Sequence, residues 1–293
     1  MKLNKSIIVC LFLVLSTIVS AAPITLHIDN THSSIQFTVP FLAISEVTGR
    51  FERFCGNFVF DDTNIMAARL ELFVDASSIN TGLKIRDRDL VEKYLQTKAY
   101  PIIYFKSKSV RLTKPNYYEV IGDLHLHGVS KELRIILTVI GDVINGEKAR
   151  EIGFKLQTIK LNRTEYGILE GAMGSGSVGD TVTISSVIRV RDVTPYRKGL
   201  DMQYPEKKSE VTFPFSGSFQ GEAGEHIKLI EDKGNYFIAF SDNDWSWFAQ
   251  AKLVGPNLYK LLSFGSLVEV KSGMISFTTS GKQAKVLTLE ELK

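Results

Sequence analysis

Cysteine is scarce in this 293-residue chain, which holds only Cys10 and Cys55. Cys10 lies in an apolar run near the N-terminus, so a chain that loses this segment keeps one thiol and forms no intramolecular disulfide. Its stability must then come from packed apolar cores. Cys55 lies in the strand-like segment FERFCGNFVF, where we expect a buried packing residue rather than a reactive nucleophile.

An excess of charge of one sign is also lacking. The chain has 35 basic and 32 acidic side chains, and its formal net charge of +3 falls to +1 without Lys2 and Lys5. Nucleic-acid binding requires a concentrated basic face, so a nearly neutral chain is a poor candidate for that class of function.

Long hydrophobic runs are confined to the N-terminus. The first 22 residues place a basic start before the apolar run 7–19 and the small residues Ser20, Ala21 and Ala22, an order typical of a secretory signal peptide. The run is short for a membrane span, and no later stretch is long and apolar enough. We therefore expect cleavage after Ala21 and a periplasmic or secreted protein without a stable membrane anchor.

Two-residue alternation of apolar and polar side chains dominates residues 32–192 and is typical of β-strands with one buried face. Roughly eight such strands with hairpin-length links predict an all-β fold and an antiparallel barrel. The segment 122–139 is the clearest case, because it reads as a strand, a turn and a second strand, each strand with one apolar face. One helical pattern, residues 83–95, interrupts the series.

The alternation stops at a polar segment with two prolines, Asp192 to Glu210, which we interpret as a linker. Short strand patterns and turns such as 232–235 then return, and they predict a second small antiparallel β domain that resembles no family we recognise. The predicted organisation is a signal peptide (1–21), a barrel (22–192), a linker (193–210) and the second domain (211–293).

The segment GDLHLHGVSK resembles the GDLTIHGVTK signature of the YceI-like family, periplasmic lipocalin-like barrels associated with polyisoprenoid lipids. Further segments match this family in the same order along residues 23–192. They are HSSIQFTV, VTGRFERFCGNFVFD, SINTGLKIRDRDL, YPIIYFKSKSV and NRTEYGI. The resemblance implies a barrel that holds one elongated lipid. It leaves the last hundred or so residues unassigned.

Inward-facing strand positions within these matching segments are the candidate ligand contacts, and a solid apolar core is the alternative. They are Phe37, Val39, Phe105, Leu124, Leu126, Ile135 and Leu137. Arg86 and Arg163 match charged positions of the family, which implies contacts to a lipid head group. Relatives often carry a histidine where this chain has Pro40-Phe41, so that end of the pocket is expected to be more apolar here.

Other polar motifs do not predict catalysis. Asp123, His125 and His127 share one strand face, but His125 departs from the family pattern, and we expect His127 to form a hydrogen bond that fixes the turn. His32 precedes two serines without a nucleophile elbow. The GxGxxG-like spacing of residues 174–179 lacks the strand-turn-helix context of a dinucleotide site. The sequence predicts no catalytic residue, metal or cofactor.

The leading hypothesis is a non-enzymatic periplasmic protein that sequesters or carries a polyisoprenoid or other long-chain amphiphilic lipid. The alternative is an envelope interaction module with a filled barrel, which binds an unidentified protein or envelope component through its C-terminal domain. Trp245, Trp247 and Phe248 would then form the contact, unless they serve the core. Either hypothesis is compatible with a homodimer.

Overall fold

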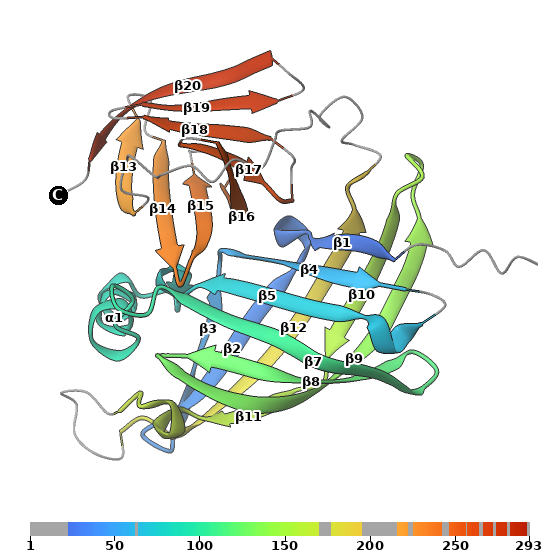
Figure 1. Ribbon diagram of the computed structural model, residues 1–293. Helices are drawn as coiled ribbons and strands as arrows, with labels where there is room; N and C mark the ends of the chain where they lie inside the picture. The colour runs from blue at the N-terminus through green and yellow to red at the C-terminus, as the bar shows by residue number, and fades with distance from the viewer. Residues whose placement is uncertain are drawn as a thin grey trace, which may run out of the picture.

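The computed structural model describes residues 23–61, 64–169, 177–194, 216–221, 225–241, 246–255, 257–263, 266–271, 274–279 and 282–291. The expected signal peptide, the expected linker (193–210) from residue 195 onward and most of the glycine-rich segment lie outside these residues, and the proposed domain boundaries stay predictions. The two parts of the chain that the sequence assigned to β structure do form two antiparallel sheets (Figure 1). The all-β fold class is therefore confirmed.

Eight strands of the first sheet close into a barrel, here called the first barrel. They are β1 (Ile24–Ile28), β4 (Phe54–Phe60), β5 (Arg69–Asp75), β7 (Ile102–Lys114), β8 (Tyr117–Leu126), β9 (Val129–Ile144), β10 (Arg150–Leu156) and β12 (Thr181–Asp192). Closure follows from β1, which pairs with β4 on one side and with the end of β12 on the other. A closed sheet leaves no unpaired edge along this cycle.

The long strand β12 connects two parts of the wall. Its C-terminal half pairs with β10 and β1, whereas its N-terminal half pairs with β2 (Ser34–Phe41) and β11 (Ile159–Asn162). Beyond β2 the sheet continues through β3 (Ser45–Phe51) to the short β6 (Ile79–Asn80). The β2–β3 hairpin therefore extends the wall beyond the closed cycle.

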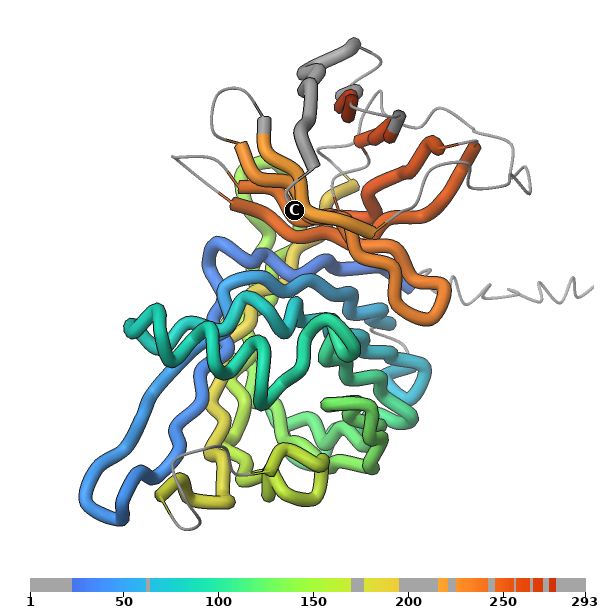
Figure 2. The backbone as a smooth tube through the Cα atoms, turned by 90° about the vertical axis from the view of Figure 1, so that its left-hand side faces the viewer, coloured from blue at the N-terminus to red at the C-terminus, as the bar shows by residue number. Residues whose placement is uncertain are grey.

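Helical structure is short. The predicted helix at 83–95 is present as α1 (Lys84–Asp89) followed by a π-helical turn, η4 (Leu90–Tyr94). The remaining helical turns of the described residues are η1 (Asn30–His32), η2 (Ile65–Ala67), η3 (Ala76–Ser78) and η5 (Arg163–Tyr166). Figure 2 shows α1 lying across one end of the first barrel.

The opposite end of the first barrel is closed by aromatic side chains. The ring of Phe58 lies 5.3 Å from that of Phe154 in an edge-on arrangement and 5.5 Å from that of Phe60, while Tyr118 packs edge-on against Phe60 and Phe154. Such T-shaped contacts favour dense packing beyond simple area burial. The interior is therefore solid at this end.

The second sheet is a smaller closed barrel, here called the C-terminal barrel. Its strands follow sequence order: β13 (Gly217–Gly221), β14 (His226–Asp232), β15 (Asn235–Ser241), β16 (Ser246–Gly255), β17 (Leu258–Leu261), β18 (Leu267–Lys271), β19 (Met274–Thr279) and β20 (Lys282–Glu291). Ile227, Ile238 and Val268 fill its core. Trp247 packs beside this core at 5.7 Å from the ring of Phe240, whereas Trp245 lies outside the described residues.

The two barrels share an apolar interface. Phe73 on the outer face of β5 lies 5.2 Å from Phe237 of the C-terminal barrel, and Phe248 stacks on Phe237. Cys55 is buried in this cluster, as expected of a packing cysteine, and burial raises the pKa of its thiol to about 12 despite a hydrogen bond from the Gln250 backbone. The shared cluster explains why β5 and β7 of the first barrel carry large apolar residues on both faces.

A buried carboxylate lies at the same interface. Asp75, fully inaccessible to solvent, accepts hydrogen bonds from Arg53 Nε and Nη2 at 3.0 and 2.8 Å. Its other oxygen accepts from the Ser77 hydroxyl at 2.7 Å and from Lys228 Nζ of the C-terminal barrel at 3.2 Å. Lys228 also donates to the Ser77 hydroxyl at 2.6 Å. The network therefore joins the two barrels through charge as well as apolar contact.

Candidate functional site

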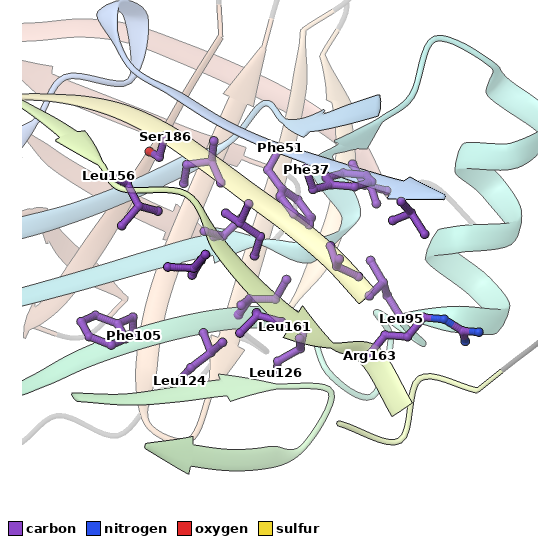
Figure 3. A pocket seen from close by; sticks show the side chains of 18 of the residues that line it. Phe37, Phe51, Leu95, Phe105, Leu124, Leu126, Leu156, Leu161, Arg163 and Ser186 are labelled. Carbon is purple, nitrogen blue, oxygen red and sulfur yellow. The ribbon is translucent and has the colours of Figure 1, made fainter. Parts of the chain in front are cut away.

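The first barrel encloses a cavity of about 660 Å³ between α1 and the aromatic end (Figure 3). All nine side chains that the sequence singled out as candidate ligand contacts line it: Phe37, Val39, Arg86, Phe105, Leu124, Leu126, Ile135, Leu137 and Arg163. Their placement is thus established, while contact with a ligand stays a prediction. The volume falls within the range of roughly 300–1,000 Å³ that small-molecule sites occupy.

The strand period explains how the walls are built. In β8, Leu124 and Leu126 point inward, and in the adjacent β9, Ile135 and Leu137 do the same because alternate residues share a face. Strands β5 and β12 contribute further walls that were not singled out from the sequence, with Leu72 and Ile184 as examples. The same alternation in RLELFVD and VTISSVIRV could have identified them.

A glycine shapes the wall near the open end. A Cβ atom at Gly49 of β3 would meet the ring of Phe37 at 2.4 Å, so the absence of a side chain leaves room for this ring. Phe37 also packs on Phe51 at 5.8 Å. The aromatic pair therefore lines the cavity without filling it.

Polar groups are few in the cavity lining. Arg86, Asp89 and Arg163 belong to the open end, together with the half-buried Tyr94, and Ser186 lies within the barrel. The Ser186 hydroxyl donates to the Ser34 carbonyl oxygen at 2.7 Å, which satisfies it internally. The interior is therefore a hydrocarbon surface that offers apolar burial rather than directed polar contacts.

Helix α1 forms one side of the opening. Leu83, Ile85 and Leu90 line the cavity here, and Arg86 donates from Nε to Thr81 Oγ1 at 2.7 Å and from Nη2 to the Thr81 carbonyl at 2.8 Å. Arg86 Nη1 makes no hydrogen bond to the residues that the structure describes. The Arg86 guanidinium is thus held in place and still has donors for a ligand.

Arg163 has a different role from Arg86. Its side chain is 5% exposed and donates to the carbonyl oxygens of Gly179, Ile168 and Val178 at 2.9–3.1 Å, and to Asp180 Oδ1 at 2.9 Å. These bonds fasten η5 to the segment that precedes β12. The contacts support a structural role for Arg163 and give no support to its predicted head-group contact.

The histidines serve local structure. His127, with φ of 50°, forms a hydrogen bond of 3.0 Å between Nδ1 and the Tyr166 carbonyl oxygen, which ties the β8–β9 turn to η5. His125 stacks on Tyr104 at 4.0 Å, and burial together with the nearby Lys233 lowers its pKa despite the opposing effect of Asp123 and Asp232. His32 contacts Asp29 within η1 and its flank. Over the described ranges, no group of three or more His, Cys, Asp or Glu could hold a metal ion.

No helix among the described residues is long and apolar enough to cross a membrane.

Comparison with known proteins matches the YceI-like domain to residues 26–190, more than half of the chain. The UPF0312 protein VPA0850 of Vibrio parahaemolyticus is 32% identical over 164 residues, which cover 55% of this chain and 84% of the relative. A UPF0312 protein of Shewanella denitrificans is 33% identical over 160 residues, 53% of this chain and 82% of the relative.

Two solved structures are similar to part of this chain. Burkholderia cenocepacia BcnA has a TM-score of 0.49 at 21% identity, covering 55% of this chain and 98% of that one. A polyisoprenoid binding domain from Saccharophagus degradans has a TM-score of 0.46 at 17% identity, covering 58% and 99%. The family match agrees with the sequence resemblance and ends before the C-terminal barrel. Through residues 26–190, this chain belongs to the YceI-like domain family.

Proposed function

We propose that the first barrel binds one long-chain apolar lipid, a polyisoprenoid or a similar amphiphile, and that the protein is a non-enzymatic carrier of it. The cavity of about 660 Å³, with hydrocarbon walls and its charged groups at one end, is the observation that carries the proposal. An amphiphile fits this arrangement because its tail needs an apolar interior and its head needs water or polar partners.

The energetics favour transport over chemistry. Burial of each CH₂ group contributes about 0.8 kcal/mol relative to water, so even a modest chain is strongly held against release into solvent. A bilayer offers the same gain, and the barrel therefore has only to match the bilayer for lipid to move between the two. Exchange at comparable affinity suits a carrier.

The head group belongs at the α1 end. Arg86 lines the cavity there and has a donor atom, Nη1, without a partner in the described chain, whereas the donors of Arg163 serve protein acceptors. We therefore place an anionic or polar head beside Arg86. The tail extends from there toward Phe105 and Phe154, which line the deeper part of the cavity.

The filled-barrel alternative fits the molecule less well, since the first barrel is hollow. Trp247 and Phe248, the described members of the contact proposed for that alternative, are engaged in packing with Phe240 and Phe237. They do not form an exposed aromatic surface for a partner.

Extraction of the purified protein with organic solvent tests the function. Mass spectrometry of the extract is expected to show a long-chain lipid in amounts close to one per chain, absent from a mock purification of cells without the protein. Repeated failure to recover lipid, together with no uptake of prenol from detergent, would exclude a lipid carrier.

Export is part of the same proposal and rests on residues 1–21. Intact-mass measurement of protein recovered from the periplasm is expected to give a mature chain that begins near Ala22 or Pro23. A chain in envelope fractions that still begins at Met1 would contradict export by signal-peptide cleavage.

A further inference from the structure

Large apolar side chains are exposed around the opening of the cavity. They come from three separate segments: Leu42 and Ile44 at the tip of the β2–β3 hairpin, Leu83 and Ile85 at the start of α1, and Leu169 after η5. Ile44 is 86% exposed and Leu169 is 66% exposed. Single exposed apolar residues are ordinary, but a group that surrounds one opening is not.

These residues are continuous with the cavity. Leu83 and Ile85 are themselves part of its lining, and Leu169 follows the lining residue Ile168. The hairpin tip lies between two lining residues, Phe41 and Val47. Figure 2 views the molecule from this side, with the β2–β3 hairpin and α1 flanking the end of the first barrel. A lipid that leaves the cavity here passes directly onto an apolar rim.

The hairpin tip departs from normal turn chemistry. Leu42 and Ala43 both have left-handed backbone angles, with φ of 52° and 55°, where asparagine and glycine are favoured. The turn is held by a hydrogen bond of 2.7 Å from the Leu42 amide to the Ser177 carbonyl oxygen. Residues unsuited both to the turn and to water point to a role for the tip outside folding.

Positive charge lies beside the α1 part of the apolar rim. Lys84 and Arg88 lie one helical turn apart on the exposed side of α1 and flank Ile85 in sequence. Within the described part of the chain neither forms an ion pair, whereas the neighbouring Asp89 is paired with Lys93 at 2.8 Å. Cations beside exposed apolar side chains are complementary to the anionic surface of a bilayer.

We propose that this rim docks the open end of the first barrel onto a lipid bilayer that carries anionic headgroups. Leu42, Ile44 and Ile85 enter the interfacial layer, and Lys84 and Arg88 contact headgroup phosphates. Docking in this way lets a lipid move between bilayer and cavity without crossing water. The transfer step rests on the proposed lipid-carrier function, whereas docking itself does not.

Co-sedimentation of the purified protein with phosphatidylcholine vesicles, with and without phosphatidylglycerol, tests the proposal. The wild type is expected to bind, and more strongly when phosphatidylglycerol is present. Ile44→Ser is expected to weaken binding about tenfold or more, because it removes one buried apolar side chain from the contact. Ile144→Ser is the matched control, since Ile144 is 65% exposed on β9, away from the opening.

Charge reversal on α1 tests the electrostatic contribution to vesicle binding. Lys84→Glu combined with Arg88→Glu is expected to abolish the preference for phosphatidylglycerol while leaving uptake of prenol from detergent unchanged. An equal effect of Ile144→Ser and Ile44→Ser, or no vesicle binding by the wild type, would overturn the docking proposal. Light scattering that shows a wild-type dimer and an Ile44→Ser monomer would also overturn it, because the rim would then be a contact between two copies of the chain.

Detergent loading distinguishes the two proposals. A wild type that takes up prenol from detergent but ignores vesicles overturns docking and supports the carrier function. A wild type that binds vesicles through the rim but never holds a lipid supports docking and overturns the carrier.

Discussion

Replacing Asp75 with alanine is expected to destabilise the protein by about 3–5 kcal/mol, the usual effect of removing one partner of a buried ion pair. The carboxylate is fully buried and bonded to Arg53, Ser77 and Lys228, and its loss leaves two partly buried cations without their anion. The free energy of unfolding in urea, followed by tryptophan fluorescence, measures the effect.

Asp142→Ala is the matched control. Asp142 likewise accepts two hydrogen bonds from an arginine, Arg150 Nε and Nη2 at 3.0 and 2.7 Å, but the Asp142 side chain is 41% exposed. Solvent screens this pair, so its loss is expected to cost less than about 1 kcal/mol. Equal effects of the two substitutions would show that burial of Asp75 is not what stabilises the interface.

The pH dependence has a defined sign. Burial alone would raise the pKa of Asp75, but Arg53, Lys228 and the Ser77 hydrogen bond outweigh it and hold the pKa below its ordinary value. The contribution of Asp75 to stability is therefore present above the unfolded pKa of about 3.9 and is lost as the pH falls through the folded value. Asp75→Ala is expected to flatten the acid limb of the stability curve.

The two cationic partners of Asp75, Arg53 and Lys228, are not equivalent. Burial lowers the pKa of Lys228 in spite of Asp75, so the contact with Asp75 does not fully offset the cost of burying the Lys228 ammonium group. Arg53, which donates two hydrogen bonds to Asp75, is the principal cationic partner. Lys228→Met, which keeps the length of the side chain, is accordingly expected to change stability by less than about 1.5 kcal/mol.

Leu126→Trp is expected to abolish most lipid binding while changing the free energy of unfolding by less than about 1 kcal/mol. Leu126 lines the cavity, and the larger ring enters space that the ligand would occupy, so packing of the protein itself is little disturbed. Lipid per chain after solvent extraction and urea unfolding of the same sample measure the two effects.

Val120→Phe provides the contrast. Val120 is completely buried in the same apolar core, but it is not part of the cavity lining. Added bulk at a filled position is expected to destabilise the fold by about 1–3 kcal/mol. If Leu126→Trp destabilises the protein as much as Val120→Phe and leaves lipid content unchanged, the cavity does not serve as the binding site.

The walls of the cavity could be predicted from sequence because their signal is local. Leu124, Leu126, Ile135 and Leu137 follow the two-residue period, and a turn between them fixes which faces meet. The helix at 83–95 carried its own periodicity. Hollowness could not be predicted, since apolar inward faces are equally compatible with a solid core.

The roles of charged residues depended on tertiary contacts. Arg163 matched a family position, but the acceptors of its guanidinium lie up to 17 residues away along the chain, in a loop whose path no local pattern specifies. Asp75 and Lys228 are separated by 153 residues, and nothing in either segment predicts their contact. The strand pattern around Cys55 did predict a buried packing residue, but nothing in that segment identified the C-terminal barrel as its cover.

Native mass spectrometry of the intact, freshly purified protein tests the central claim most directly. The account predicts one discrete mass increment per chain, matching a long-chain lipid, which disappears on collisional activation and is absent from Leu126→Trp. A wild-type spectrum that holds only the bare chain mass, before and after incubation with prenol in detergent, would contradict the claim that the cavity is a lipid site.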